Sequence, residues 1–152
     1  MKKINLSLFL AVFVSAILFS VSSCKTKETK PDPTPPTMTN ITIEGSNKNF
    51  TATVTFSEAV YKNSDKTGAL DNNSFNVTLN GGTAALESYQ VTHTAGATEA
   101  TIEITLTDLS DGTEELTIVP SSSASIYDNE GTEMEASQSK TITLRAHHIK
   151  RF

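Results

Sequence analysis

Five acidic residues in the polar segments of this chain have the side chains best suited to bind a hard cation. They are Glu58, Asp65, Asp71, Asp128 and Glu130. Calcium takes about six to eight oxygen ligands, mainly from carboxylates and carbonyls. These residues are therefore candidate ligands of a calcium site, provided that the segment after Phe56 and the segment around Tyr127 lie at the same end of the fold.

The same acidic residues have a simpler interpretation as turn residues. Neither segment shows the regularly spaced acids of an EF-hand loop. Asp and Asn are common in turns because their side chains hydrogen-bond the local backbone. Solvated turns without a bound ion are therefore the expected arrangement, and a calcium site is the alternative.

Cys24 is the only cysteine of the chain, so it cannot form an internal disulfide. It follows Val21, Ser22 and Ser23, and the chain before these residues starts with lysines and continues as a mostly apolar run. A charged start, a short apolar stretch and small residues before a cleavage point are the features of a secretory signal. Polar residues such as Ser15 interrupt the run, which makes it a poor membrane span beside the ~20 apolar residues that a helix needs.

The order Val21-Ser22-Ser23-Cys24 resembles the lipobox of bacterial lipoprotein signals. The resemblance implies cleavage after residues 1–23, a diacylglyceryl group on the sulfur of Cys24, and acylation of the new amino terminus by a fatty acid such as palmitate. Each buried methylene contributes ~0.8 kcal/mol, so two or more chains anchor a protein firmly. We expect an exported protein held by lipid in the bacterial cell envelope, in the outer membrane, facing the periplasm or the surface. The alternative is an ordinary signal peptide with a free thiol.

The chain shows no arrangement typical of nucleophilic catalysis. It lacks the G-x-S-x-G sequence that presents a nucleophilic serine. His93 shares the parity of the apolar residues near the end of a predicted strand, so we expect it to be packed or at the rim. Glycoside hydrolysis needs two carboxylates at a defined separation, which a count of acidic residues does not supply. We expect a protein that is not an enzyme, with a carbohydrate-active enzyme as the remaining catalytic alternative.

Acidic residues outnumber basic ones, with 17 Asp and Glu against 12 Lys and Arg and a formal net charge of −5. Nucleic-acid binding depends on Lys and Arg that neutralise phosphates, so a nucleic-acid partner is not expected. Direct contact with anionic lipid headgroups is disfavoured for the same reason. The acidic surface suits solubility and the attraction of cations.

Residues 24–38 have the composition of a tether. Four of the five prolines, Pro31, Pro33, Pro35 and Pro36, lie here among polar residues. With almost nothing apolar to bury, the segment is expected to be disordered or extended. At ~3.1 Å per residue, it would hold the following domain roughly 40 Å from the membrane.

In several short stretches between Ile41 and Leu144 the apolar residues recur at every second position, which predicts strands with one buried face. The linkers are too short for the crossover helices of a parallel sheet. About seven such strands indicate an all-β antiparallel sandwich. The core is predicted to contain Phe50, Val54, Phe56, Phe75, Val77, Tyr89, Val91, Ile102, Ile104, Leu106, Leu116, Ile118, Ile142 and Leu144.

Three stretches, 56–61, 68–75 and 125–131, resemble in order and spacing the bacterial Ig-like domains found in surface-layer proteins and adhesins. The resemblance covers most of residues 39–145 and implies an immunoglobulin-like β-sandwich that serves as a spacer, stalk or adhesive module without catalysis. Such domains often occur in tandem and one copy is found here, so a long stalk is not expected. Residues 146–152 break the alternation and are predicted to be a tail.

These observations together favour a cell-envelope lipoprotein with a non-enzymatic binding or adhesion module. The expected partner is a glycan or a surface or matrix protein, contacted through loops at one end of the sandwich. The alternative is a structural spacer or an assembly subunit of an envelope complex, with no ligand of its own. The sequence leaves the oligomeric state open.

Overall fold

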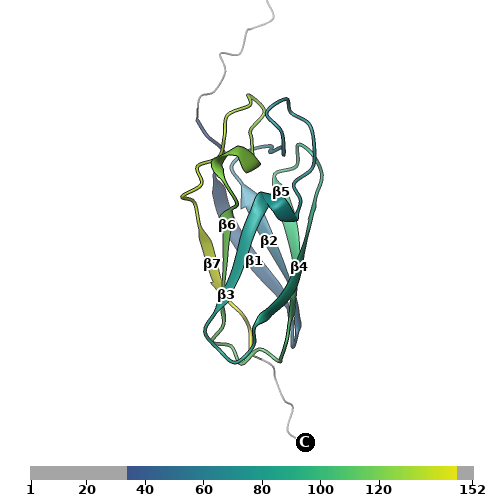
Figure 1. The fold of residues 1–152 in the computed structure, drawn as a ribbon, viewed down its shortest axis with the longest axis vertical. Helices are drawn as coiled ribbons and strands as arrows, with labels where there is room; N and C mark the ends of the chain where they lie inside the picture. The colour runs from purple at the N-terminus through teal and green to yellow at the C-terminus, as the bar shows by residue number, and fades with distance from the viewer. Residues whose placement is uncertain (1–33, 147–152) are drawn as a thin grey trace, which may run out of the picture. The chain divides into compact units, whose positions relative to one another are not determined.

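Seven β-strands follow one another in the computed structural model, which describes residues 34–146 (Figure 1). The strands are β1 Met38–Ser46, β2 Asn49–Phe56, β3 Phe75–Asn80, β4 Leu86–His93, β5 Glu99–Leu106, β6 Glu115–Pro120 and β7 Lys140–Thr143. Two short 3-10 helices, η1 Asn72–Ser74 and η2 Ser123–Ser125, lie in the connections.

The strands form two sheets, with the order β1-β2-β5-β4 in one and β3-β6-β7 in the other. All neighbouring strands are antiparallel. In Figure 1, β3 of the three-stranded sheet lies in front of β1 and β2 of the four-stranded sheet. The prediction of an all-β antiparallel sandwich of about seven strands is confirmed.

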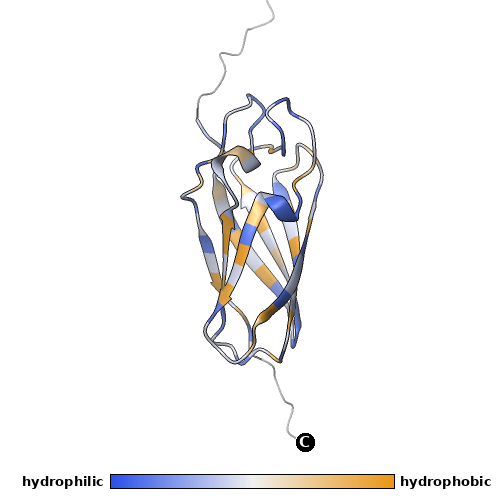
Figure 2. Cartoon of the chain, viewed as in Figure 1, coloured by the Kyte–Doolittle hydropathy of each residue, from blue (hydrophilic) through white to orange (hydrophobic). Residues whose placement is uncertain are grey.

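The period of two in the sequence explains which side chains enter the space between the sheets. In β2, Phe50, Ala52, Val54 and Phe56 are buried, and the threonines between them are only partly buried. Apolar colour accordingly alternates with pale or polar colour along the strands in Figure 2. Since consecutive side chains of a strand point to opposite faces, one face of each sheet becomes core and the other becomes surface.

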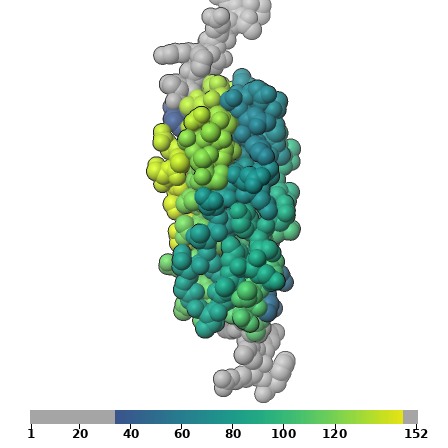
Figure 3. All heavy atoms as spheres, in the orientation of Figure 1, coloured from purple at the N-terminus to yellow at the C-terminus, as the bar shows by residue number. Residues whose placement is uncertain are grey.

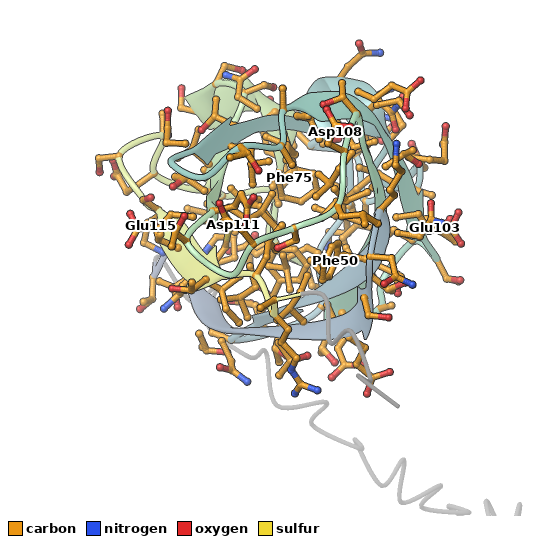
Figure 4. All side chains as sticks on the ribbon, turned by 90° about the horizontal axis from the view of Figure 1, so that it is seen from below. Phe50, Phe75, Glu103, Asp108, Asp111 and Glu115 are labelled. Carbon is orange, nitrogen blue, oxygen red and sulfur yellow. The ribbon has the colours of Figure 1, made fainter. Side chains whose placement is uncertain are left out.

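Seen along the strands in Figure 4, the side chains of Phe50 and Phe75 lie between the sheets, whereas Glu103 and Glu115 point outward. The rings of Phe56 in β2 and Phe75 in β3 stack across the interface, with centroids 6.5 Å apart and an interplanar angle of 22°. Aromatic contacts of this kind add to the hydrophobic gain from burial.

All predicted core side chains are buried except Tyr89 and Ile142, which are partly buried and pack against the core. Tyr89 is partly polar, and its hydroxyl donates to the backbone oxygens of Asn72 at 3.2 Å and Phe75 at 3.0 Å. These bonds connect β4 of one sheet with the start of β3 in the other.

A second set of core residues comes from the loops. Val60, Leu70, Ile126 and Met134 are buried and belong to the same hydrophobic core as the strand residues. They fall outside the alternating pattern because irregular backbone has no fixed period. Their burial fixes the long connections at the end of the sandwich where β2 and β6 finish, which we call the loop end.

The first strand begins one residue before the predicted domain start at residue 39. Met38 opens β1 and is 4% exposed. Its backbone nitrogen donates to Oε1 of Gln138 at 2.7 Å, and Nε2 of Gln138 donates to the backbone oxygen of Pro36 at 3.0 Å. Gln138 therefore holds the entry of the chain against the segment before β7.

Candidate functional site

Two segments far apart in the sequence are joined at the loop end. Tyr61 and Tyr127 form an antiparallel bridge, with reciprocal backbone hydrogen bonds of 2.8 and 2.9 Å. Figure 3 shows these two parts of the chain, coloured blue-teal and yellow-green, side by side at the top of the visible face. The condition for the predicted calcium site, that both segments lie at one end, is therefore met.

Glu58 lies in a short segment that is anchored on both sides. The amide of Ser57 donates to the backbone oxygen of Thr37 at 2.8 Å, and the amide of Gly96 donates to the backbone oxygen of Val60 at 2.9 Å. Val60 is itself fully buried. The backbone that carries Glu58 is thus positioned by the strands around it.

The second segment is a tight loop from Ile126 to Met134, closed by a 2.9 Å backbone hydrogen bond from Met134 to Ile126. Within it, the amide of Asp128 donates to the backbone oxygen of Thr132 at 3.0 Å. Gly131 has φ +83°, and a Cβ there would lie 2.8 Å from the backbone oxygen of Ser64. The loop therefore packs closely against the 61–68 connection, at a position that requires glycine.

Three acidic side chains meet between these segments. One carboxylate oxygen each from Glu58, Asp128 and Glu130 lies within 4.8 Å of the other two. Asp128 is fully buried, Glu58 is half-buried and Glu130 is exposed. Such a group of oxygen atoms is chemically suited to a hard cation.

The two oxygens of Asp128 have different environments. Oδ1 accepts hydrogen bonds from the amides of Glu130 and Thr132, both at 2.7 Å. Oδ2 is buried and has no hydrogen-bond partner, and it is the one such side-chain atom among residues 34–146. Buried polar atoms almost always have a partner, so Oδ2 lacks an interaction that residues 34–146 do not supply.

Two residues predicted to share the site lie outside the group of three. Asp71 forms an ion pair with Lys62 and caps η1, where it accepts from the amide of Asn73 at 3.0 Å. The hydrogen bond from Lys62, opposed by burial and aided by the bond from Asn73, lowers the pKa of Asp71. Asp65 is exposed and accepts a hydrogen bond from the hydroxyl of Thr67. Of the five predicted ligands, the structure therefore brings Glu58, Asp128 and Glu130 together, whereas local partners hold Asp65 and Asp71 outside the group.

A polar hollow of about 250 Å³ also lies at the loop end. It is lined by Lys62, Asn63, Asn73, Ser74, Ser121, Ser122, Ala124 and Ser125. The hydroxyl of Ser125 donates to the backbone oxygen of Ser122 at 2.7 Å, and that of Ser121 donates to the backbone oxygen of Asn73. These bonds connect η2 and the end of β6 with η1, so the walls of the hollow are held in place.

His93 has a structural position at the end of β4. The amide of Leu70 donates to its Nδ1 at 3.1 Å, which places the ring proton on Nε2, 3.2 Å from the backbone oxygen of Ala97. Burial, opposed by the bond to Ala97, lowers the pKa of His93. The ring is half-buried, as expected for a packed or rim residue.

A buried carboxylate at the opposite end of the sandwich was missed. Glu114 is fully buried, and its carboxylate accepts from the hydroxyl of Ser110 at 2.7 Å and from the amides of Gly112 at 3.1 Å, Asp111 at 3.2 Å and Ala84 at 3.3 Å. Burial disfavours its charged form, yet the hydrogen bonds outweigh burial and lower the pKa of Glu114 from 4.5 to about 2. Its place two residues before Leu116, on the buried parity, is the signal that could have found it.

The predicted lipidation at Cys24, the signal peptide and most of the tether lie outside the described residues. Among residues 34–146, no helix has the length and apolar character needed to cross a membrane. No family model, no curated protein and no solved structure matches this chain.

Proposed function

We propose that this chain is an exported lipoprotein of the bacterial cell envelope, and that its β-sandwich is a non-enzymatic binding or adhesion module. Cys24 carries the lipid, the proline-rich segment is the tether, and the loop end makes the contact. The proposed partner is a glycan or, alternatively, a surface or matrix protein.

The strand order supports an immunoglobulin-like sandwich. In constant-type immunoglobulin domains, strands A, B, E and D form one sheet and strands C, F and G form the other. Numbering the seven strands here in the same way turns β1-β2-β5-β4 into A-B-E-D and β3-β6-β7 into C-F-G. Domains with this architecture commonly bind partners through loops at one end, because the rigid sheets position those loops.

The observation that carries the proposal is the polar hollow at the loop end. Its volume of about 250 Å³ is close to the lower limit of ligand pockets, roughly 300 Å³. Asn, Ser and Lys side chains line it, and such groups exchange hydrogen bonds with sugar hydroxyls. One sugar residue of a glycan is a suitable occupant.

The surface chemistry favours a glycan over a protein partner. Leu109 is the one large apolar side chain that is exposed among residues 34–146, at 45%. It lies between β5 and β6, at the end opposite the loop end. Protein interfaces usually depend on buried aromatic or aliphatic anchors, which the loop end does not offer as an exposed patch.

A binding panel tests the proposal. The full chain, purified in non-ionic detergent, would be probed against immobilised glycans and matrix proteins. Asn73→Ala changes an exposed side chain of the hollow, and Asn76→Ala makes the same change on the outer face of β3 as a matched control. We expect at least one glycan to bind, with affinity reduced about tenfold or more by Asn73→Ala alone. If no member of the panel binds, the structural spacer replaces the binding module.

The lipid anchor has a separate test. Replacing Cys24 by alanine removes the sulfur that would carry the diacylglyceryl group. We expect the wild-type chain to partition into the detergent phase of a cell extract and its mass to include fatty acids, and we expect the Cys24→Ala chain to lack both properties. A variant that still carries the lipid mass would contradict the anchor.

A further inference from the structure

We propose that Glu58, Asp128 and Glu130 form a calcium site that holds the two segments of the loop end together. The site does not depend on the proposed glycan partner, because its ligands lie within the chain. Its basis is the fully buried Asp128 together with the two acids that meet it.

The first step concerns the open oxygen of Asp128. The tight loop satisfies Oδ1 with two amides at 2.7 Å, which is how an ordinary turn uses an aspartate. The turn supplies no hydrogen-bond donor to Oδ2, although this atom is buried. A buried carboxylate oxygen without a partner carries a free-energy cost, because it has lost its hydration without gaining a hydrogen bond. A bound cation removes that cost.

The second step concerns the distance between the three carboxylates. Calcium binds oxygen at about 2.3–2.6 Å, so two ligands on opposite sides of one ion are about 5 Å apart at most. The oxygens of Glu58, Asp128 and Glu130 lie within 4.8 Å of one another, so one ion can contact all three. Three carboxylates this close repel one another, and a divalent cation between them reverses the sign of that interaction.

The third step concerns the choice of ion. The group contains only oxygen ligands, whereas structural zinc sites depend mainly on cysteine and histidine. Glu130 is exposed, which leaves room for the water and carbonyl ligands that complete a shell of about six to eight oxygens. Magnesium requires near-ideal octahedral geometry at about 2.0–2.1 Å, a tighter arrangement than this group needs.

The fourth step concerns what the ion would do. Glu58 belongs to the segment that leaves β2, and the other two ligands belong to the loop before β7. The bridge between Tyr61 and Tyr127 already joins these segments through the backbone. An ion between the side chains adds a second connection and stabilises the loop end.

Terbium luminescence offers a direct test, because Tb³⁺ occupies calcium sites and is excited by a nearby aromatic ring. The chain has no tryptophan, and Tyr127 directly precedes Asp128. The hydroxyl of Tyr61 lies 3.5 Å from Oδ1 of Asn129 in the same loop. We expect the full chain in detergent to show tyrosine-sensitised emission that Ca²⁺ displaces, with a dissociation constant of about 10⁻⁴–10⁻³ M as in extracellular modules.

Three variants assign the signal to the site. Glu130→Gln removes a charge from an exposed side chain, and Asp128→Asn keeps Oδ1 as the acceptor of the turn while replacing Oδ2. Asp65→Asn is the matched control, since Asp65 lies at the same end but outside the group. We expect the first two variants to weaken Ca²⁺ affinity tenfold or more and the control to change it less than twofold.

Two results would overturn the site. One is a failed terbium experiment, in which either no sensitised emission is seen or Ca²⁺ at about 100 times the expected dissociation constant does not displace the Tb³⁺. The other is an equal loss in Asp65→Asn, which would indicate attraction by the acidic surface in general. Either result would leave the glycan proposal standing, because the hollow at Asn73 and Ser122 contains none of the three ligands.

Discussion

The two ends of the sandwich each contain a fully buried carboxylate, and the two are satisfied to different extents. Glu114 accepts hydrogen bonds at both oxygens, from the hydroxyl of Ser110 and from backbone amides. Within residues 34–146, Asp128 accepts two amide hydrogen bonds at Oδ1 and none at Oδ2. Asp111, in the loop that surrounds Glu114, is labelled at the near end of the molecule in Figure 4.

The difference shows that burial alone does not distinguish a structural acid from a ligand. Charged groups are buried only when hydrogen bonds or opposite charges offset the loss of water. At Glu114 the chain supplies the donors, and the low pKa follows from them. At Asp128 residues 34–146 satisfy Oδ1 alone, and Oδ2 is the atom on which we base the proposed cation site. The number of open lone pairs is therefore more informative than the exposed fraction.

Replacing Glu114 by glutamine is expected to have the largest effect on stability. The side-chain nitrogen of the glutamine is a donor, and it would lie buried against backbone N–H donors such as those of Asp111 and Gly112. We expect a loss of about 3 kcal/mol or more in the free energy of unfolding, measured by denaturant titration at pH 7. Ser110→Ala, which removes one of several donors to the carboxylate, is the milder comparison, with a loss of about 2 kcal/mol. Equal stability of the Gln variant and wild type would mean that the carboxylate is not needed.

Acid titration is expected to have the next largest effect. The folded-state pKa of Glu114 is about 2, below the ordinary value of 4.5. The ionised carboxylate therefore contributes fully to the free energy of unfolding above pH 4.5, and this contribution is lost as the pH falls towards 2. The full contribution corresponds to about 3 kcal/mol. The lowered pKa of Asp71 makes stability fall with pH in the same direction. The difference in the free energy of unfolding between wild type and Ser110→Ala, followed across this pH range, isolates the part that depends on Glu114. That difference should narrow as the pH falls, and a constant difference would contradict the assignment.

Adding one methyl group beside Glu114 is expected to have a smaller effect. Gly82 has φ +62°, and a Cβ there would lie 2.4 Å from Oε1 of Glu114. We expect Gly82→Ala to lose about 2 kcal/mol, because both the backbone conformation and the contact become unfavourable. Thr83→Ala, at an exposed neighbouring position, is the control and should stay within about 0.5 kcal/mol of wild type. Thermal unfolding of wild type and both variants measures these losses, and equal midpoints for Gly82→Ala and Thr83→Ala would contradict the prediction.

Replacing Asp128 by asparagine is expected to have the smallest effect in chelator. Oδ1 of the amide still accepts from Glu130 and Thr132, and one of three neighbouring negative charges disappears. We expect the free energy of unfolding to change by less than about 1 kcal/mol. At a calcium concentration ten times the dissociation constant of wild type, wild type should gain about 1.4 kcal/mol, whereas the variant, with affinity at least tenfold weaker, should gain about 0.4 kcal/mol or less. A large loss in chelator would show that Asp128 is structural, like Glu114.

The strands could be predicted because alternation is a local property. Residues such as Val54, Ile104 and Ile118 lie on the buried parity of their strands, and all three are fully buried. The loop residues Val60 and Met134 could not be predicted in this way, since irregular backbone does not alternate. Only the packing of the loops against the sheets placed them in the core.

The candidate site was predicted in part. Glu58, Asp128 and Glu130 were named because acids follow a strand end and a turn, and the bridge between Tyr61 and Tyr127 brings them together. Asp65 and Asp71 carry the same chemistry, but Thr67 and Lys62 hold them elsewhere. Which acids share a space depends on the route of the backbone between them.

The sequence by itself determined the fold class, the buried face of each strand and the candidate signal and lipidation residues, because these depend on neighbouring positions. Only the tertiary structure decided that Glu114 is satisfied and that Oδ2 of Asp128 is open. The physical reason is that hydrogen-bond satisfaction depends on donors from other segments, such as the amide of Ala84 for Glu114. Local pattern sets the direction in which a side chain points, and the packing of distant segments decides what it meets.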